Sequence, residues 1–264
     1  MTTIEPDTVR EHVRARYGEI AESSSGCCGR MSARCCDSEK NYERRLGYSA
    51  AEIASVPEGS NLGLGCGNPT AIASIRSGET VLDLGSGAGF DCFLAARQLN
   101  GTGRVIGVDM TPAMVAKGRR NARKGNFANV EFRLGEIEAI PVADNSIDLV
   151  ISNCVINLSP EKPLVFREAF RVLKAGGRLA IADVVATKPL PESVRTRLNS
   201  VASCVGAAAS VDEMKTMLEN VGFTRIEIVP RDETRSLIND WTDNENGGEF
   251  VASAFITARK AFQA

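Results

Sequence analysis

The sequence predicts an α/β fold. We expect a doubly wound, Rossmann-like mixed sheet of about seven strands, with an N-terminal helical and loop extension and a helical capping insertion. Two observations predict this fold. Short β-branched runs alternate with amphipathic segments from Thr80 onward, and a glycine-rich turn follows the first run. The length of 264 residues is sufficient for one elaborated domain with a sizeable core.

Five β-branched apolar runs, bounded by Gly, Asp or Asn, are expected to be strands of a parallel sheet with helices on both faces. These runs lie at 81–84, 104–108, 130–134, 147–151 and 179–182. Two later runs, at 225–229 and 251–257, are expected to complete a mixed sheet at its edge.

The helices are expected before and between these strands. Thr111 is a favoured N-cap residue and Pro112 suits the first helical position, so a helix should begin there and run toward Lys124. Ser159 should open another helix, which the glycines at 176–177 end. Further helices are expected at 9–21, after the glycine turn through 99, and within 186–222.

The chain divides into three parts. Residues 1–79 form a Cys-containing extension, residues 80–185 the α/β core with the glycine turn, and residues 186–264 the capping helices and the last edge strands. A loop rich in Ser, Gly and Cys is expected at 23–37, and a polar loop at 242–249.

Charge and hydropathy argue against several classes of partner. Thirty-one Lys and Arg against thirty-three Asp and Glu give a net charge of −2, so nucleic acid and anionic membranes are not expected partners. No run approaches the roughly 18 apolar residues of a membrane span, and the N-terminus lacks a secretion signal. We therefore expect a cytoplasmic protein whose thiols are reduced at rest.

Eight Cys and a single His, His12, are the informative counts. A single His excludes most chemistry that needs imidazole. Eight Cys are about 3% of the chain, far below the roughly 8–10% of a disulfide scaffold. Four of the Cys form two adjacent pairs, at 27–28 and 35–36, and the others stand singly. The single thiols are Cys66, Cys92, Cys154 and Cys204.

Glycines at 85, 87 and 89 join the first strand to the following helix. They allow tight backbone geometry and close approach of a ligand, but their spacing departs from the dinucleotide fingerprint. Asp109 follows the second strand, where a carboxylate accepts hydrogen bonds from ribose hydroxyls. Residues 134–138, after the third strand, suit the wall of an adenine site.

Together with Arg171–Gly177, these motifs resemble the successive motifs of class I S-adenosylmethionine-dependent methyltransferases. The resemblance implies S-adenosylmethionine as the cofactor. The residues implied around its methionine part are Asp83, Gly85, Ser86 and Gly87; those around its ribose and adenine are Asp109 and Met110; and those at the adenine edge are Glu136, Ile137 and Glu138. Asn153, at the end of the fourth strand, is assigned to the same site.

Three single thiols are candidates for one binding site. Cys154 follows the fourth strand, so it should face the crevice at the carboxyl ends of the strands. Cys204 lies in the capping insertion and Cys66 on a turn before the first strand. A thiol suits soft, thiophilic centres.

The Cys contexts resemble the arsenite methyltransferase family over nearly the whole chain. The matching segments are Tyr17-Gly18, Cys27-Cys28, 65–69, 89–93, 152–158 and Cys204. The resemblance implies that Cys154 and Cys204 bind trivalent arsenic. Cys66 and either Cys27 or Cys28 would supply a third thiolate, or a disulfide that a reductant such as thioredoxin or glutathione restores. The stretch 205–210 and the four N-terminal Cys depart from the family pattern.

Other interpretations remain open. Cys92 fits a buried apolar role, and the Cys at 27, 28, 35 and 36 would suit a zinc or redox cluster only with unusual spacing. The chain could methylate a small organic acceptor such as a quinone precursor, or act as a non-catalytic thiol sensor of soft metalloids.

Trivalent arsenic has its own lone pair, so its methylation needs no general base. This agrees with a chain that contains a single His.

Overall fold

The computed structural model describes residues 5–23, 42–195, 201–202, 204–239 and 247–262. These residues contain a seven-stranded mixed sheet in the order β3-β2-β1-β4-β5-β7-β6, so the predicted fold class is confirmed. The strands are β1 (Thr80–Leu84), β2 (Arg104–Asp109), β3 (Val130–Leu134), β4 (Ile147–Asn153), β5 (Leu173–Ala186), β6 (Phe223–Arg231) and β7 (Val251–Lys260).

The five predicted central strands pair in parallel, and β7 pairs antiparallel with both β5 and β6. The described helices are α1 (Pro6–Glu22), α3 (Ala50–Ser55), α4 (Pro69–Ile72), α5 (Phe90–Gln98), α6 (Pro112–Lys124), α7 (Lys162–Val172), α8 (Glu192–Arg195), α10 (Val211–Val221) and α11 (Arg235–Asn239). Short 3-10 turns are η1 (Ile156–Leu158), η2 (Asp232–Thr234) and η3 (Gly247–Glu249).

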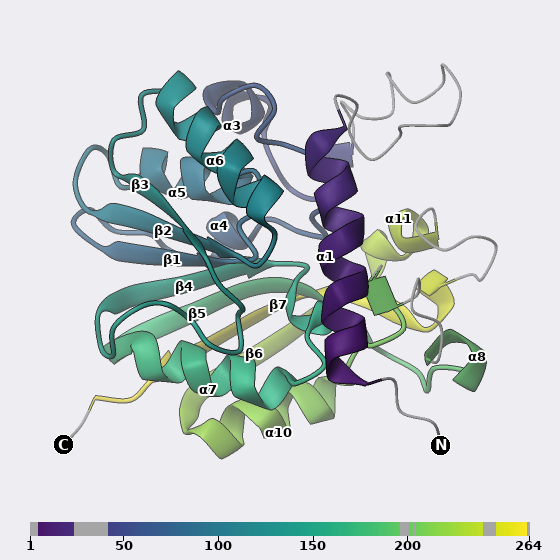
Figure 1. Cartoon of the computed structure of the whole chain (residues 1–264). Helices are drawn as coiled ribbons and strands as arrows, with labels where there is room; N and C mark the ends of the chain where they lie inside the picture. Colours follow the sequence, from purple (N-terminus) through teal and green to yellow (C-terminus); the bar gives the residue numbers. More distant parts are fainter. Residues whose placement is uncertain (1–4, 24–41, 196–200, 203, 240–246, 263–264) are drawn as a thin grey trace.

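Helices cover both faces of the sheet, as Figure 1 shows: α4, α5 and α6 lie on one face, and α7 and α10 on the other. Alternate residues of β1 explain this arrangement, because Val81 packs in the core on one face and Leu82 and Leu84 in the core on the other. A strand buried on both faces must be apolar throughout, which accounts for the runs seen in the sequence.

Helix α6 follows Thr111 as predicted, whereas both boundaries of α7 differ from the predictions. Thr111 takes the N-cap position of α6, but its side chain makes no capping hydrogen bond. The helix expected to open at Ser159 begins at Lys162, because the Ser159 hydroxyl donates to Glu138 instead. That helix ends at Val172, before the glycines, because the chain enters β5 at the next residue.

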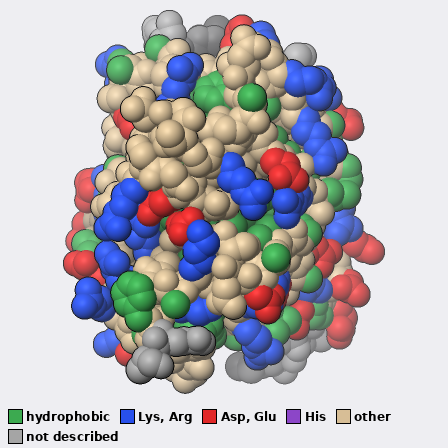
Figure 2. All heavy atoms as spheres, turned by 90° about the vertical axis from the view of Figure 1, so that its left-hand side faces the viewer, with side chains coloured by type: hydrophobic (Ala, Val, Ile, Leu, Met, Phe, Trp, Pro, Cys, Tyr) green, Lys and Arg blue, Asp and Glu red, His purple; other side chains and the backbone are tan. Residues whose placement is uncertain are grey.

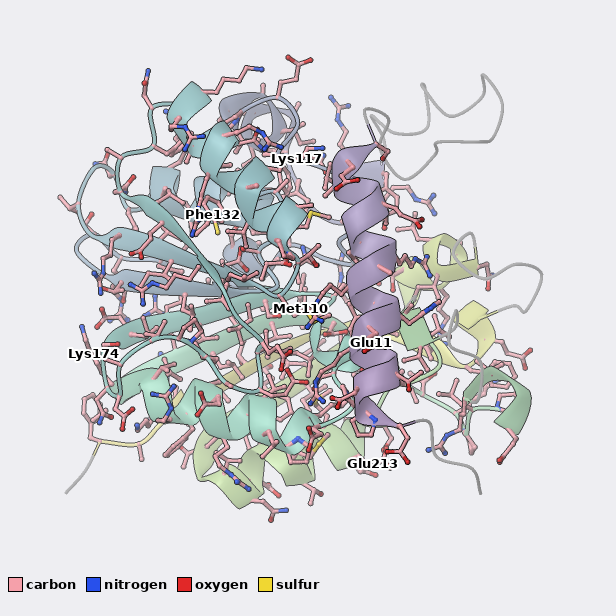
Figure 3. The ribbon with its side chains drawn as sticks, in the orientation of Figure 1. Glu11, Met110, Lys117, Phe132, Lys174 and Glu213 are labelled. Carbon is pink, nitrogen blue, oxygen red and sulfur yellow. The ribbon has the colours of Figure 1, made fainter. Side chains whose placement is uncertain are left out.

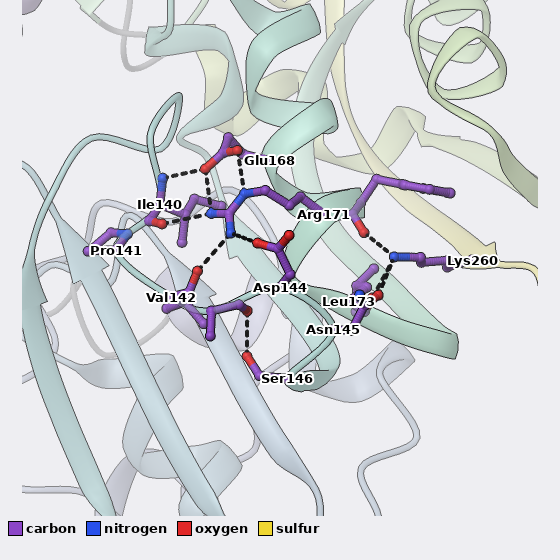
Figure 4. Close-up of polar contacts among 12 residues, drawn as sticks. Ile140, Pro141, Val142, Asp144, Asn145, Ser146, Glu168, Arg171, Leu173 and Lys260 are labelled. Atoms are coloured by element: carbon purple, nitrogen blue, oxygen red, sulfur yellow. Dashed lines mark hydrogen bonds and ion pairs between the residues drawn. The ribbon is translucent and has the colours of Figure 1, made fainter.

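The loop between β3 and β4 is fastened to α7 by Arg171 (Figure 4). Its guanidinium donates to the carbonyls of Ile140 and Val142, and Glu168 accepts from the Ile140 N–H. The same guanidinium pairs with Glu168 and Asp144. This contact fixes the loop that carries the expected adenine-edge residues.

The described surface carries charges of both signs. On the face shown in Figure 2, Lys and Arg side chains are interspersed with Asp and Glu. Among the described residues, no helix combines the length and the apolar character needed to cross a bilayer.

Candidate active site

A pocket lies where the parallel strands β1, β2 and β4 end, beside the residues that follow each strand. It is the crevice that an open α/β sheet offers to ligands. Nine of the ten residues assigned to the cofactor site line it: Asp83, Gly85, Ser86, Gly87, Asp109, Met110, Ile137, Glu138 and Asn153. Glu136 is not among its lining residues; it pairs instead with Arg14 of α1.

The glycine turn needs glycine at position 85. Gly85 has φ +68, and a Cβ there would lie 2.4 Å from Cγ2 of Val155. Gly87 has φ +50, and no atom lies within 4 Å of where its Cβ would stand. The turn therefore leaves open space over Gly87, where a ligand can approach the backbone.

Asp109 closes this turn. Its carboxylate accepts from the N–H of Gly87 at 2.9 Å and of Thr111 at 2.8 Å. Burial raises its pKa, while the two N–H donors act in the opposite direction. Each carboxylate oxygen keeps a further lone pair for a ligand hydroxyl. The buried Ser86 hydroxyl beside it has no hydrogen-bond partner among the residues that the structure describes.

Helix α1 closes one side of the pocket. Arg10, Val13 and Tyr17 line the pocket from one face of the helix. Arg10 pairs with Glu138 and Glu161. At the other end of α1, Lys117 of α6, labelled in Figure 3, donates to the carbonyl of Ala21. A role of α1 in the pocket was not predicted, although the i, i+3, i+7 spacing of these side chains signals a shared face.

The thiols of Cys66, Cys154 and Cys204 meet beside this pocket. The Cys154 thiol contacts both other thiols, and the Cys204 thiol donates to the Cys154 carbonyl at 3.1 Å. All three side chains are buried in one apolar cluster. Cys154 also lines the pocket, so the thiol cluster adjoins the expected cofactor site.

The surroundings keep the thiols of Cys66 and Cys154 protonated. Contacts with the Cys204 and Cys66 thiols, and then burial, raise the pKa of Cys154 well above its ordinary value. Burial also raises the pKa of Cys66. A thiolate forms here when a bound centre takes the place of the proton.

Cys154 and Cys204 both have left-handed backbone conformations, with φ +57 and +66. This region is uncommon for residues other than glycine, and such strain gathers at functional sites. The Cys154 N–H donates to the Ala182 carbonyl of β5, which helps to hold the strained residue in place.

Comparison with known proteins identifies the family. The methyltransferase domain family matches residues 75–222. The chain is 52% identical to the arsenite methyltransferase of Halobacterium salinarum over 97% of its own length and 68% of the relative's. The chain belongs to the arsenite methyltransferase family.

Two further members of the arsenite methyltransferase family are similar at greater distance. The enzyme of Aquipseudomonas alcaligenes is 36% identical over 84% of this chain and 64% of its own. The crystal structure of an arsenic (III) S-adenosylmethionine methyltransferase from Chlamydomonas reinhardtii is 34% identical, with a TM-score of 0.61 over 84% of this chain and 73% of its own. The chain thus spans about two thirds of the length of the Halobacterium salinarum and Aquipseudomonas alcaligenes proteins.

In this member of the arsenite methyltransferase family, Asp183 lies beside two of the three thiols, and the sequence had not marked it as a candidate. One of its oxygens and the sulfurs of Cys66 and Cys154 lie within 4.8 Å of one another. Asp183 accepts from the Ile156 N–H and from the Asn157 side chain, so it holds the turn that follows Cys154. A lone carboxylate inside the apolar run of β5 was the signal.

The other Cys of the chain separate into two groups. Cys92 is fully buried in α5, as predicted, and donates to Asp83 at 3.1 Å. Cys27 and Cys28 lie outside the described residues, as does the pair at 35–36. Their assignment stays a prediction.

Proposed function

We propose that this chain transfers methyl groups from S-adenosylmethionine to trivalent arsenic bound by the thiols of Cys66, Cys154 and Cys204. The observation that carries the proposal is the contact of the Cys154 thiol with the other two thiols, directly beside the pocket of the glycine turn. Thiols suit a soft centre such as arsenic. Membership of the arsenite methyltransferase family supports this substrate.

The pocket residues fit S-adenosylmethionine. The open space over Gly87, the unpartnered hydroxyl of Ser86 and the free lone pairs of Asp109 suit a polar ligand with ribose hydroxyls. When bound, this cofactor supplies a methyl group on a positively charged sulfonium. Ile137 lines the adenine side as an apolar wall.

Capture of arsenite by the thiols balances without an external base. Each thiol that bonds to As(OH)3 gives its proton to a departing hydroxide, so three As–S bonds form, three As–O bonds break and three waters leave. The raised pKa of Cys66 and of Cys154 favours the protonated thiol until arsenic arrives. Arsenic keeps its lone pair, which is the nucleophile.

Positioning is then the main task of the protein. The buried cluster excludes water, and Asp183 fixes the turn after Cys154. Both effects hold the bound arsenic in one place against the pocket wall that Cys154 forms. Holding reactants in a near-attack arrangement supplies a large share of the rate enhancement of many enzymes.

Methyl transfer from labelled S-adenosylmethionine to arsenite, measured in reducing buffer, tests the proposal. We expect methylated arsenic from the native chain. Cys154→Ser and Cys204→Ser should abolish transfer with little loss of S-adenosylhomocysteine affinity. Cys92→Ser is the matched control, because it removes a buried thiol outside the cluster and should leave arsenite binding intact.

The alternatives give other results. No arsenite binding by the reduced protein would contradict the proposal and favour a small organic acceptor such as a quinone precursor. Arsenite binding without binding of S-adenosylhomocysteine would contradict it in favour of a non-catalytic thiol sensor.

The proposal extends to compartment and thiol supply. We place the protein in the reducing cytoplasm, without nucleic-acid or membrane partners, where thioredoxin or glutathione restores its thiols. Cys27 or Cys28 would provide the N-terminal thiol. Replacing each by Ser should impair repeated turnover while a first methyl transfer survives, which single-turnover and steady-state assays distinguish.

A further inference from the structure

A buried chain of hydrogen bonds joins the pocket to the backbone of Cys66. The Asn153 amide donates to Oδ2 of Asp91 at 2.9 Å, and its oxygen accepts from the Cys66 N–H at 3.0 Å. Tyr48 donates to the other oxygen of Asp91 at 2.7 Å, and Asn153 donates also to the Gly67 carbonyl. One amide therefore contacts both a pocket carboxylate and the loop of an expected arsenic ligand.

The Cys66 loop depends on such contacts from outside. It lies between α3 and α4, where residues 56–68 form no helix or strand. The Tyr42 hydroxyl donates to the Gly65 carbonyl and the Ser253 hydroxyl to the Cys66 carbonyl, both at 2.7 Å. Asn153 supplies the contact to the Cys66 N–H, and a Cβ at Gly65 would lie 2.7 Å from the amide nitrogen of Asn153.

Asp91 is a buried carboxylate that faces the pocket without a cation. It is 7% exposed, and no Lys or Arg among the described residues forms an ion pair with it. Asp83, a second buried carboxylate of the pocket, likewise has no basic partner within the part of the chain that the structure describes. A buried carboxylate without a counter-charge is costly, so this end of the pocket favours a cationic ligand group.

Resting on the proposed function, we propose that Asp91 binds the ammonium group of the methyl donor's methionine part and, through Asn153, couples donor binding to the placement of Cys66. A bound ammonium pairs with the Asp91 carboxylate and fixes its orientation, and the Asn153 amide that donates to this carboxylate is ordered with it. Asn153 then holds the Cys66 N–H more firmly. The Cys66 loop therefore loses less conformational entropy when arsenic binds the third thiol. Donor and arsenic therefore bind with positive cooperativity.

Calorimetric titration of the reduced protein with arsenite, in a phosphine reductant that does not compete for arsenic, tests this coupling. Arsenite affinity is measured for the protein alone, saturated with S-adenosylhomocysteine, and saturated with adenosine. S-adenosylhomocysteine has the ammonium group and should tighten arsenite binding by about tenfold, within the usual range of coupling between sites. Adenosine lacks the methionine part and should leave arsenite affinity within about twofold.

Two variants break the chain at different points. Asp91→Asn removes the charge, and Asn153→Ala removes the link while Asp91 remains. Both should bring the S-adenosylhomocysteine effect on arsenite affinity below about twofold, while arsenite alone still binds. Glu219→Gln, an exposed acidic position on α10, is the matched control and should keep the full effect.

The outcomes separate the two proposals. Equal arsenite affinity with and without S-adenosylhomocysteine in the native chain, or undiminished coupling in both folded variants, would overturn the inference and leave the proposed function intact. If arsenite does not bind to the protein alone, with S-adenosylhomocysteine or with adenosine, the result contradicts the proposed function itself.

Discussion

Among Gly65, Gly85 and Gly87 of the pocket, Gly85 leaves the least room for a Cβ. Gly85→Ala adds a methyl group against Val155 as well as left-handed backbone strain. We expect it to lower the free energy of unfolding by about 2–4 kcal/mol and S-adenosylhomocysteine affinity by at least about tenfold. Denaturant unfolding and calorimetry measure the two effects.

Gly101→Ala is the control for the cost of placing Ala in a left-handed backbone conformation. Gly101 has φ +79 with no atom within 4 Å of its Cβ position, so only the strain remains, about 1–2 kcal/mol. Equal losses of stability in the two variants would contradict the steric argument for Gly85.

Asp91 predicts a pH dependence of donor binding. Burial raises the pKa of Asp91 to about 6, and the nearby Glu52 acts in the same direction. The hydrogen bonds from Tyr48 and Asn153 act in the opposite direction and lower this pKa. Asp83 is the other carboxylate that faces it. Because the ammonium group needs the ionised carboxylate, S-adenosylhomocysteine affinity should rise as pH increases through about 6 and level off above it.

The same titration with Asp91→Asn should lose most of this rise, since the remaining side chain does not ionise. Adenosine is the matched ligand, and its affinity should depend little on pH across the same range. A native profile that falls as pH increases through 6 would refute the role of Asp91.

At the scale of elements, α1 completes the pocket, and its ion pairs hold it there. Arg10 has only 14% of its side chain exposed and faces Glu136, Glu138 and Glu161. Arg10→Ala leaves Glu138 buried without this cation, so S-adenosylhomocysteine affinity should fall by about tenfold or more. Isothermal titration measures the change.

Arg14→Ala is the matched control on the same helix. Arg14 is 41% exposed and, among the described residues, pairs only with Glu136, and an exposed pair contributes little. We expect its effect on affinity to stay below about threefold. If Arg10→Ala and Arg14→Ala behave alike, α1 does not act through its buried ion pairs.

The elements also show which features local sequence can predict. β-branched runs located the seven strands of the described residues, and the central strands β1, β4 and β5 are apolar because both of their faces are buried. The predicted start of α7 was wrong because Ser159, a favoured N-cap residue, donates to Glu138 in the earlier loop between β3 and β4. Local propensity does not include such distant partners.

For the whole molecule, the sheet topology unites residues that are distant in sequence. The positions of the glycine turn, Asp109 and Cys154 at one edge follow from strands that end there, which the sequence predicts. The meeting of Cys66 and Cys204 with Cys154 was expected only through family resemblance. The bonds of Asp91 and Asn153 span 43 to 105 residues, so no local pattern encodes them.

The central claim is that three thiols bind trivalent arsenic beside the methyl-donor pocket. A crystal structure of the reduced protein with arsenite, with arsenic located by its anomalous scattering, tests this claim most directly. We predict one arsenic atom bonded to the sulfurs of Cys66, Cys154 and Cys204 and to no oxygen. Arsenic bound elsewhere, or to only one of these sulfurs, would contradict the account.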